Sequence, residues 1–83
     1  MKLKSIANNQ TEITFTNGTR IFFSYETPVA AYDADAGAWI RTSTKFSTTT
    51  SRHINKWLET IDANKVEQGR LECLVLACDK TWL

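Results

Sequence analysis

Residues 11–25 read TEITFTNGTRIFFSY, and this stretch decides the fold. Apolar and polar residues alternate on both sides of Asn17-Gly18, a dipeptide typical of tight turns between antiparallel strands. A two-residue loop would pair Ile13 with Phe22, whereas a three-residue loop with Gly18 in the left-handed conformation pairs Ile13 with Ile21. We favour the longer loop because it alone gathers four apolar side chains on one face: Ile13, Phe15, Ile21 and Phe23.

Further strands are expected on both sides of this hairpin, which itself pairs Thr11–Thr16 with Arg20–Tyr25. Lys2–Ile6 is a short strand candidate before it. Pro28 suits the first position of a strand, and Val29–Tyr32 and Ala38–Thr42 read as a second hairpin around a turn rich in small and acidic residues. The N-terminal half therefore predicts an antiparallel sheet of four to five strands.

The period of the apolar residues changes from two to 3.6 after residue 50. Ile54, Trp57, Leu58 and Ile61 recur at helical spacing, which predicts an amphipathic helix over about Thr50–Asp62. Thr48, Thr49 and Thr50 are candidate N-cap residues. We expect the central part of this helix, Ser51–Ile61, to cover one face of the sheet.

The C-terminal segment 65–83 is consistent with either a buried strand or a helix. A helical stripe is formed by Leu71, Leu74, Val75 and Cys78, and it favours a second helix over about Val66–Asp79. Gly69 argues against this helix, because glycine is a poor helix former. The fold class expected is α+β, with one or two C-terminal helices packed on the sheet. The core is expected to bury ten side chains together: Ile13, Phe15, Ile21, Phe23, Ile54, Trp57, Leu58, Leu71, Leu74 and Val75.

The size and composition of the chain restrict its class. Its 83 residues suffice for one domain, 1–83, and 42% hydrophobic residues argue against disorder. No apolar run is long enough to span a bilayer, and MKLKSIANNQ lacks the apolar core of a signal peptide. We expect a soluble cytoplasmic domain that does not act at a membrane.

No catalytic motif and no metal site is expected. Cys73 and Cys78 are five residues apart, which fits neither redox nor zinc spacing, so two buried reduced thiols are expected. Ser51 and His53 lie two apart on the predicted helix and do not face each other, which argues against a nucleophile and base. His53 is expected to be half-buried or at the surface. The sequence thus predicts a non-enzyme without cofactors.

The charge is unevenly distributed along the chain, although the total is only +1. Residues 41–58 contain four bases and no acid, whereas residues 21–40 and 59–83 are each net negative. Segregation of this kind suggests a contact face for an acidic partner. The residues expected to form it are Trp39, Arg41, Lys45, Arg52, His53 and Lys56.

Aromatic residues are the other candidates for recognition. Trp39, Phe46, Trp57, Tyr25 and Tyr32 are able to stack on bases, but most aromatic residues in so small a domain belong to the core. Trp57 is core by its spacing, and Trp39 and Tyr32 are the ones expected at the surface. An exposed aromatic residue beside arginine is also a common anchor of protein–protein interfaces.

Two segments within Asn9–Leu58 carry a resemblance. SYETPVAAY (24–32) and TTSRHINKWL (49–58) are similar to a family of small uncharacterised bacteriophage proteins, whose members share the NGT-type turn. The resemblance covers about fifty of the 83 residues and brings no catalytic residue with it. It implies a phage protein that acts in the cytoplasm of a bacterial host.

Two functions follow as expectations. The first is a non-enzymatic binding protein that inhibits or redirects a host macromolecular machine, a host protein or ribonucleoprotein complex, as an anti-defence protein of the anti-CRISPR kind does. The alternative is a small nucleic-acid-binding accessory or regulatory protein. A complex held by phosphate contacts weakens steeply with salt and an apolar protein interface does not, so a salt titration separates the two.

Overall fold

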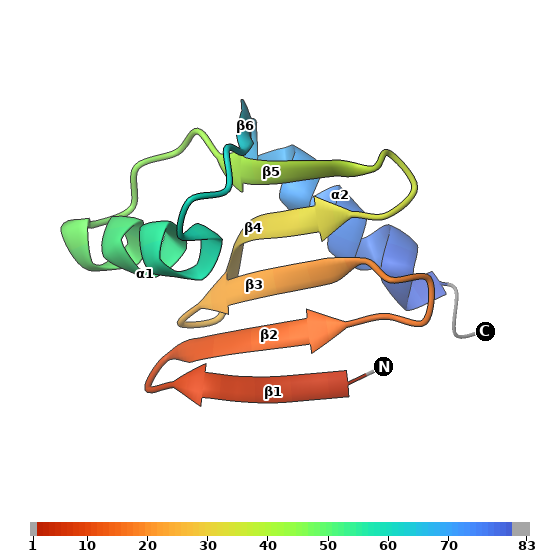
Figure 1. The fold of residues 1–83 in the computed structure, drawn as a ribbon, viewed down its shortest axis with the longest axis horizontal. Helices are drawn as coiled ribbons and strands as arrows, with labels where there is room; N and C mark the ends of the chain where they lie inside the picture. Colours follow the sequence, from red (N-terminus) through yellow and green to blue (C-terminus); the bar gives the residue numbers. More distant parts are fainter. Residues whose placement is uncertain (1, 81–83) are drawn as a thin grey trace.

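The Asn17-Gly18 hairpin lies within a meander of five antiparallel strands (Figure 1). A computed structural model describes residues 2–80. Each strand pairs with its neighbour in the chain, so the order in the sheet is the order in the sequence. The strands are β1 (Lys2–Ala7), β2 (Gln10–Thr14), β3 (Arg20–Ser24), β4 (Thr27–Asp33) and β5 (Ala38–Thr42).

The register of the β2–β3 hairpin is the one that the alternation predicts. Ile13 pairs with Ile21, and the N–H of Phe15 donates to the carbonyl oxygen of Thr19 at 2.8 Å. The loop is therefore three residues long, and Gly18 has φ of +93°. Glycine adopts this conformation without the steric cost that a Cβ atom brings, which explains its place in the turn.

The chain crosses over after β5 and adds a sixth strand. α1 (Thr48–Leu58) follows β5, and β6 (Asn64–Val66) then pairs in parallel with β5. The α+β class is confirmed, but the sheet has six strands and is mixed, where four to five antiparallel strands were expected. β6 has only three residues, too few to show a period in the sequence.

α1 begins and ends earlier than its apolar stripe predicts. Ser47 is the N-cap, and its hydroxyl accepts from the backbone N–H of Thr50 at 3.1 Å, so none of the three predicted threonines caps the helix. Glu59 has φ of +52°, which ends the helix after Leu58. Ile61 consequently lies outside the helix and is exposed, although its spacing fits the stripe.

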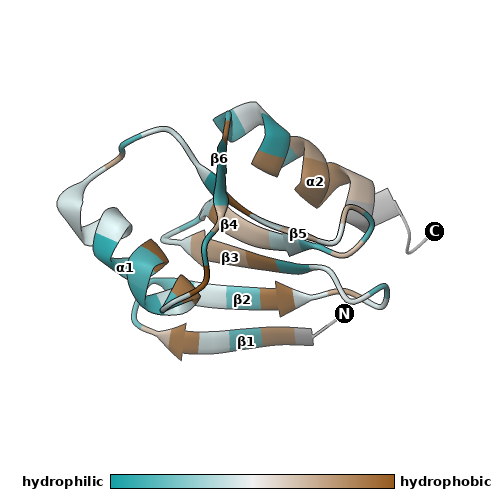
Figure 2. Cartoon of the chain, turned by 45° about the horizontal axis from the view of Figure 1, so that its top comes forward, coloured by the Kyte–Doolittle hydropathy of each residue, from teal (hydrophilic) through white to brown (hydrophobic). Residues whose placement is uncertain are grey.

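The two helices lie on opposite faces of the sheet. α2 (Gln68–Lys80) packs Leu71 and Leu74 against one face, and α1 packs Ile54 and Leu58 against the other. In Figure 1, α2 lies behind the strands. Figure 2 shows hydrophobic stretches in the central strand β3 as well as in both helices. A second helix is thus present, as favoured, but it begins at Gln68 instead of Val66, which belongs to β6, and it does not share a core with α1.

The expected single core is therefore wrong, because it divides into two clusters. The cluster under α2 contains buried Phe15, Ile21, Ala31, Ile40, Leu71 and Leu74, with Ile13, Phe23 and Val75 partly buried beside them. The cluster under α1 contains buried Phe22, Val29, Ala30, Ile54 and Leu58, with Trp39 and Trp57 partly buried. Phe22, which is not among the ten expected core residues, is fully buried. Strands covered on both faces have apolar residues on both sides of the pleat.

One ion pair ties α2 to the end of β4. Arg70 Nη2 lies 2.6 Å from Asp33 Oδ2, and the other carboxylate oxygen accepts from the N–H groups of Asp35 and Ala36. Burial raises the pKa of Asp33, but the hydrogen bonds from Arg70, Ala36 and Asp35 outweigh it and bring the pKa below its ordinary value. The carboxylate fixes the β4–β5 turn that the acidic sequence 33–37 predicts.

Neither helix in the described residues is long and apolar enough to cross a membrane. Cys73 on α2 is a free thiol and is exposed, which corrects the expectation that it is buried. It directly precedes Leu74, which packs on the sheet. The side chain of Cys78 is outside the part that the structure describes.

Candidate functional site

A basic groove lies where β5, β6 and α1 meet. Its hollow has a volume of about 160 Å³. Three bases line the groove: Arg41, Lys45 and Lys65. The other lining residues are four with hydroxyl groups (Thr42, Ser43, Thr44 and Ser51) and one apolar residue, Ile54. We call these residues the basic groove. Bases and hydroxyl groups both donate hydrogen bonds to anionic oxygens, so the lining suits a phosphate or a carboxylate.

The fold brings the three bases together from separate parts of the chain. Arg41 is on β5 and pairs in register with Lys65 on β6, while Lys45 belongs to the loop that leads from β5 to α1. The parallel β5–β6 pair therefore places two bases directly beside each other. Such a pair is unfavourable on its own, because like charges on adjacent strands repel.

Arg41 is the base that the groove holds most firmly. Its Nη1 donates to Oδ1 of Asn55 on α1 at 3.1 Å. Its Nε is buried and has no hydrogen-bond partner among the residues that the structure describes. Lys45, by contrast, is exposed. The groove thus combines one oriented guanidinium with an exposed ammonium.

No carboxylate offsets this charge locally. No acid lines the groove, and within residues 2–80 none of its three bases forms an ion pair. The first turn of α1 likewise contains no acid. The groove is thus a concentration of unneutralised positive charge, and such a concentration attracts anions at a distance as well as on contact.

Three of the other predicted contact residues, Arg52, His53 and Lys56, do not line the groove. Arg52 is exposed on α1, and Lys56 lines a different pocket on the side of β1 and β2. His53 is half-buried, as expected, with its Nδ1 2.9 Å from the hydroxyl oxygen of Ser24 on β3. The structure therefore gathers Arg41 and Lys45 of the predicted face, and adds Lys65.

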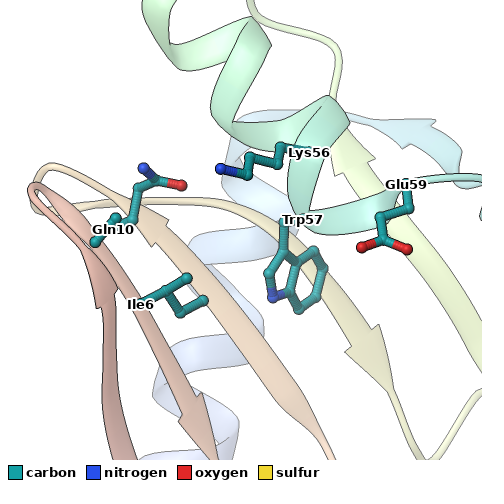
Figure 3. Close-up of a pocket in the computed structure, with 6 residues that line it drawn as sticks. Ile6, Gln10, Lys56, Trp57 and Glu59 are labelled. Carbon is teal, nitrogen blue, oxygen red and sulfur yellow. The ribbon is translucent and has the colours of Figure 1, made fainter.

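The second pocket lies between the C-terminal end of α1 and the β1–β2 hairpin (Figure 3). It has a volume of about 250 Å³. In Figure 3 the Trp57 ring points from α1 toward the strands, with Ile6 and Glu59 on either side and Lys56 above. Lys56 and Glu59 bring both signs of charge to its lining, so this pocket has no bias toward an anion.

Four aromatic rings form a line across the face of the sheet that α1 covers. The centroids of Tyr32 and Trp39 are 4.8 Å apart, those of Trp39 and Trp57 are 5.7 Å apart, and Phe22 stacks on Trp57 at 5.2 Å. Tyr32, Trp39 and Trp57 are partly exposed, and only Phe22 is fully buried. Tyr25 and Phe46, at 51% and 47%, are more exposed than the two aromatic residues expected at the surface.

Ser24 and His53 have the contact of a nucleophile and a base, but the surroundings differ from those of a catalytic pair. Ser24 is 2% exposed, and its hydroxyl donates to Oγ1 of Thr50 at 3.3 Å. Thr50 also accepts from the hydroxyl of Ser47. A buried hydroxyl that is already engaged in this way is inaccessible to a substrate, and the chain of hydroxyls instead ties the N-terminal turn of α1 to β3.

A family model described as "Family of unknown function (DUF8033)" matches residues 1–73. The chain belongs to this DUF8033 family. The match includes all six strands, α1 and every residue of the basic groove, and it ends within α2. No curated protein and no solved structure matches this DUF8033 chain.

Lys65 is the groove residue that sequence reasoning missed. It lies outside the basic run 41–58, in a segment whose net charge is negative. Only the parallel pairing of β6 brings it beside Arg41. A prediction of the crossover would have identified it, and the sequence contains no other signal for this contact.

Proposed function

We propose that this protein is a non-enzymatic binding protein, encoded by a bacteriophage, that binds a host macromolecular machine in the host cytoplasm. The basic groove carries the proposal. Three bases from three segments share one hollow without a neutralising acid. Their mutual repulsion costs stability, and a bound anionic group of a partner offsets that cost. An inhibitor of host defence, of the anti-CRISPR kind, is the specific role that the phage resemblance favours.

The chemistry of the groove supports binding in preference to catalysis. Its side chains are bases and hydroxyls, which hold and orient an anion. The histidine of the chain hydrogen-bonds to a buried serine on the other side of α1. A binding protein needs only surface for its partner, and a footprint of about 800 Å² is available on a domain of this size.

Capture from a lysate of the bacterial host tests the proposal. The tagged protein is compared with two charge-reversal variants, Lys45→Glu with Lys65→Glu in the groove and Arg52→Glu with Lys56→Glu on α1. All four residues are exposed, so both variants are expected to fold, which circular dichroism checks. We expect the groove variant to recover at least tenfold less partner than the parent does.

The two variants also locate the contact surface. If the α1 variant alone loses the partner, the surface is the outer side of α1 and the basic groove is not part of it. If both variants recover as much partner as the parent, neither set of bases is a contact surface and the proposal is wrong. Treatment of the lysate with nuclease shows whether a nucleic acid is part of the partner.

A second function, nucleic-acid binding, is favoured by one observation. Four of the eight residues that line the groove carry a hydroxyl group, and hydroxyl groups together with bases are the usual donors to phosphate oxygens. A nucleic-acid-binding accessory or regulatory protein is therefore the alternative. Its complex should lose affinity steeply as salt rises, with a slope that falls when Lys45 or Lys65 is neutralised.

A further inference from the structure

A row of side chains crosses the sheet on the face that carries α1. The registers pair Thr14 with Arg20, Arg20 with Tyr32, and Tyr32 with Trp39. Residues that are directly opposite in register lie on the same face, so these four side chains form a line across β2, β3, β4 and β5. Arg20 has the same orientation on β3 as Phe22, which packs under α1.

The row is partly open to solvent, and Trp39 also packs beside the cluster under α1. Arg20 is exposed, and Thr14, Tyr32 and Trp39 are partly exposed. Figure 1 looks onto this face: α1 lies toward one end of the strands, α2 lies behind the sheet, and on this face the half of the strands away from α1 is not covered by a helix. The two rings of the row are 4.8 Å apart and tilted by 48°. The row therefore presents a short aromatic surface with a guanidinium beside it.

The open row is continuous with the basic groove. Trp39 and Arg41 are two residues apart on β5, so their side chains are on the same face and about 7 Å apart along the strand. Lys65 follows on the adjacent strand. A ligand that lies on Tyr32 and Trp39 thus reaches the groove without leaving the surface.

We infer that single-stranded nucleic acid binds along this surface, with bases on Tyr32 and Trp39 and phosphates at Arg20 and the basic groove. This inference rests on the basic groove of the proposed function and names the chemistry of its partner. Aromatic side chains on an open sheet stack on unpaired bases, and flanking bases hold the phosphates. Duplexes hide their base faces, so they do not fit this arrangement.

The surroundings of the rings favour nucleic acid over an acidic protein. Around Tyr32 the neighbours in register are Arg20 and Trp39, and Thr14 lies next to Arg20 along the same row. A protein anchor is instead surrounded by apolar contacts that exclude water. The large exposed apolar side chains of the described residues all lie outside the row, although Ile6 lines the pocket beside Trp57: they are Leu3, Ile6, Tyr25, Phe46, Ile61 and Leu76.

One acid, Glu12, lies on this face within the described strands. Its Oε1 accepts from the indole Nε1 of Trp57 at 2.8 Å. Glu12 is also paired in register with Lys4. The carboxylate is therefore held beneath α1 rather than in the open row, and a strand across Tyr32 and Trp39 does not need to pass over it.

Fluorescence anisotropy with labelled oligonucleotides of about 12 nucleotides tests the inference. The purified protein is titrated with oligouridylate and oligothymidylate, and with a duplex of equal length. We expect both single strands to bind, the duplex to bind at least tenfold more weakly, and the affinity to fall steeply between about 50 and 200 mM salt. The two single strands distinguish RNA from DNA.

Matched variants assign the contact to the open row. Tyr32→Ala is expected to weaken binding about tenfold, because it removes one stacking surface, and Tyr32→Phe is expected to keep the affinity. Tyr25→Ala is the control, since Tyr25 is an exposed tyrosine in the β3–β4 turn, outside the row. Circular dichroism of each variant confirms that it is folded.

The inference is overturned if the parent binds neither single strand, or if Tyr32→Ala binds as tightly as Tyr25→Ala. Equal affinity for duplex and single strand also overturns it, because the contact is then to phosphates alone. The lysate experiment is independent of these outcomes. If it recovers a nuclease-resistant protein partner while oligonucleotides do not bind, the proposed function stands and the groove contacts an acidic protein.

Discussion

The indole Nε1 of Trp57 donates a 2.8 Å hydrogen bond to Oε1 of Glu12, and this bond joins α1 to β2. The two residues are 45 positions apart in the sequence. The same indole stacks on Phe22 with an angle of only 12° between the ring planes. Trp57 therefore stabilises the docking of α1 by packing and by a polar contact, and substitution can separate the two contributions.

Trp57→Phe should keep most of the packing and lose the hydrogen bond. We expect it to lower the free energy of unfolding by about 1 kcal/mol, the usual net value of such a bond. Trp57→Ala also removes the ring. Because the ring is only partly buried, we expect the free energy of unfolding to fall by about 3 kcal/mol, the lower end of the range for such truncations. Urea denaturation measures both. Equal losses in the two variants would show that the ring contributes nothing by packing.

Neighbouring phenylalanines on β3 provide a test of the two-sided sheet. Phe22 is fully buried under α1, whereas Phe23 is partly buried on the α2 face. Phe22→Ala should lower the free energy of unfolding by about 4 kcal/mol, because it leaves a cavity in the core. Phe23→Ala should lower it clearly less, because truncation of a partly exposed ring leaves no closed cavity. Thermal unfolding followed by circular dichroism compares them. A larger loss at Phe23 would place the main core on the α2 face.

The two faces also explain what the sequence predicts and what it leaves out. The β2–β3 register follows from Ile13, Gly18 and Ile21 alone, because loop length and alternation are local properties. The burial of Phe22 does not follow from these local properties. Its side chain points away from the face of Ile21 and Phe23, and that second face is buried only because α1 covers it. The one sign of this burial in the sequence is the unbroken apolar run Ile21-Phe22-Phe23, which is typical of a strand buried on both sides.

Glu59 stores backbone strain at the end of α1. Its φ of +52° with ψ of −107° is a conformation that favours glycine. Glu59→Gly should therefore raise the free energy of unfolding by about 1 kcal/mol. Glu59→Ala is the control, because it removes the carboxylate but keeps the strain. A gain in the alanine variant as large as that in the glycine variant would assign the effect to charge at the helix C-terminus instead.

Asp33 makes the stability of the fold dependent on pH. Its pKa is lower in the folded chain than the ordinary value of 3.8, so its contribution is present above that value and is lost as the pH falls through the folded pKa. Arg70→Gln should cost about 1 kcal/mol near neutral pH, because Arg70 is 43% exposed and solvent screens the pair. The difference from the parent should shrink as the pH falls below 3.8 and Asp33 becomes protonated. Urea denaturation across this range measures it, and a constant difference would mean that Arg70 acts by packing alone.

The candidate site shows the same division between local and long-range information. Arg41 and Lys45 stand out in the sequence because they belong to an acid-free run, and the structure places both in the groove. Lys65 is brought there by a parallel pairing that depends on the whole crossover from β5 through α1. Lys56 belongs to the same run as Arg41, but the rotation of the helix directs it to the opposite side.

The order of the strands has a consequence for folding kinetics. Every pair from β1 to β5 joins neighbours in the chain, so the meander closes through short loops whose entropy cost is small. We expect β6 to pair after the meander has formed, because its pairing with β5 closes a loop of more than twenty residues. The basic groove is therefore expected to assemble late in folding, and the protein then acquires its positive surface only when the last strand is in place.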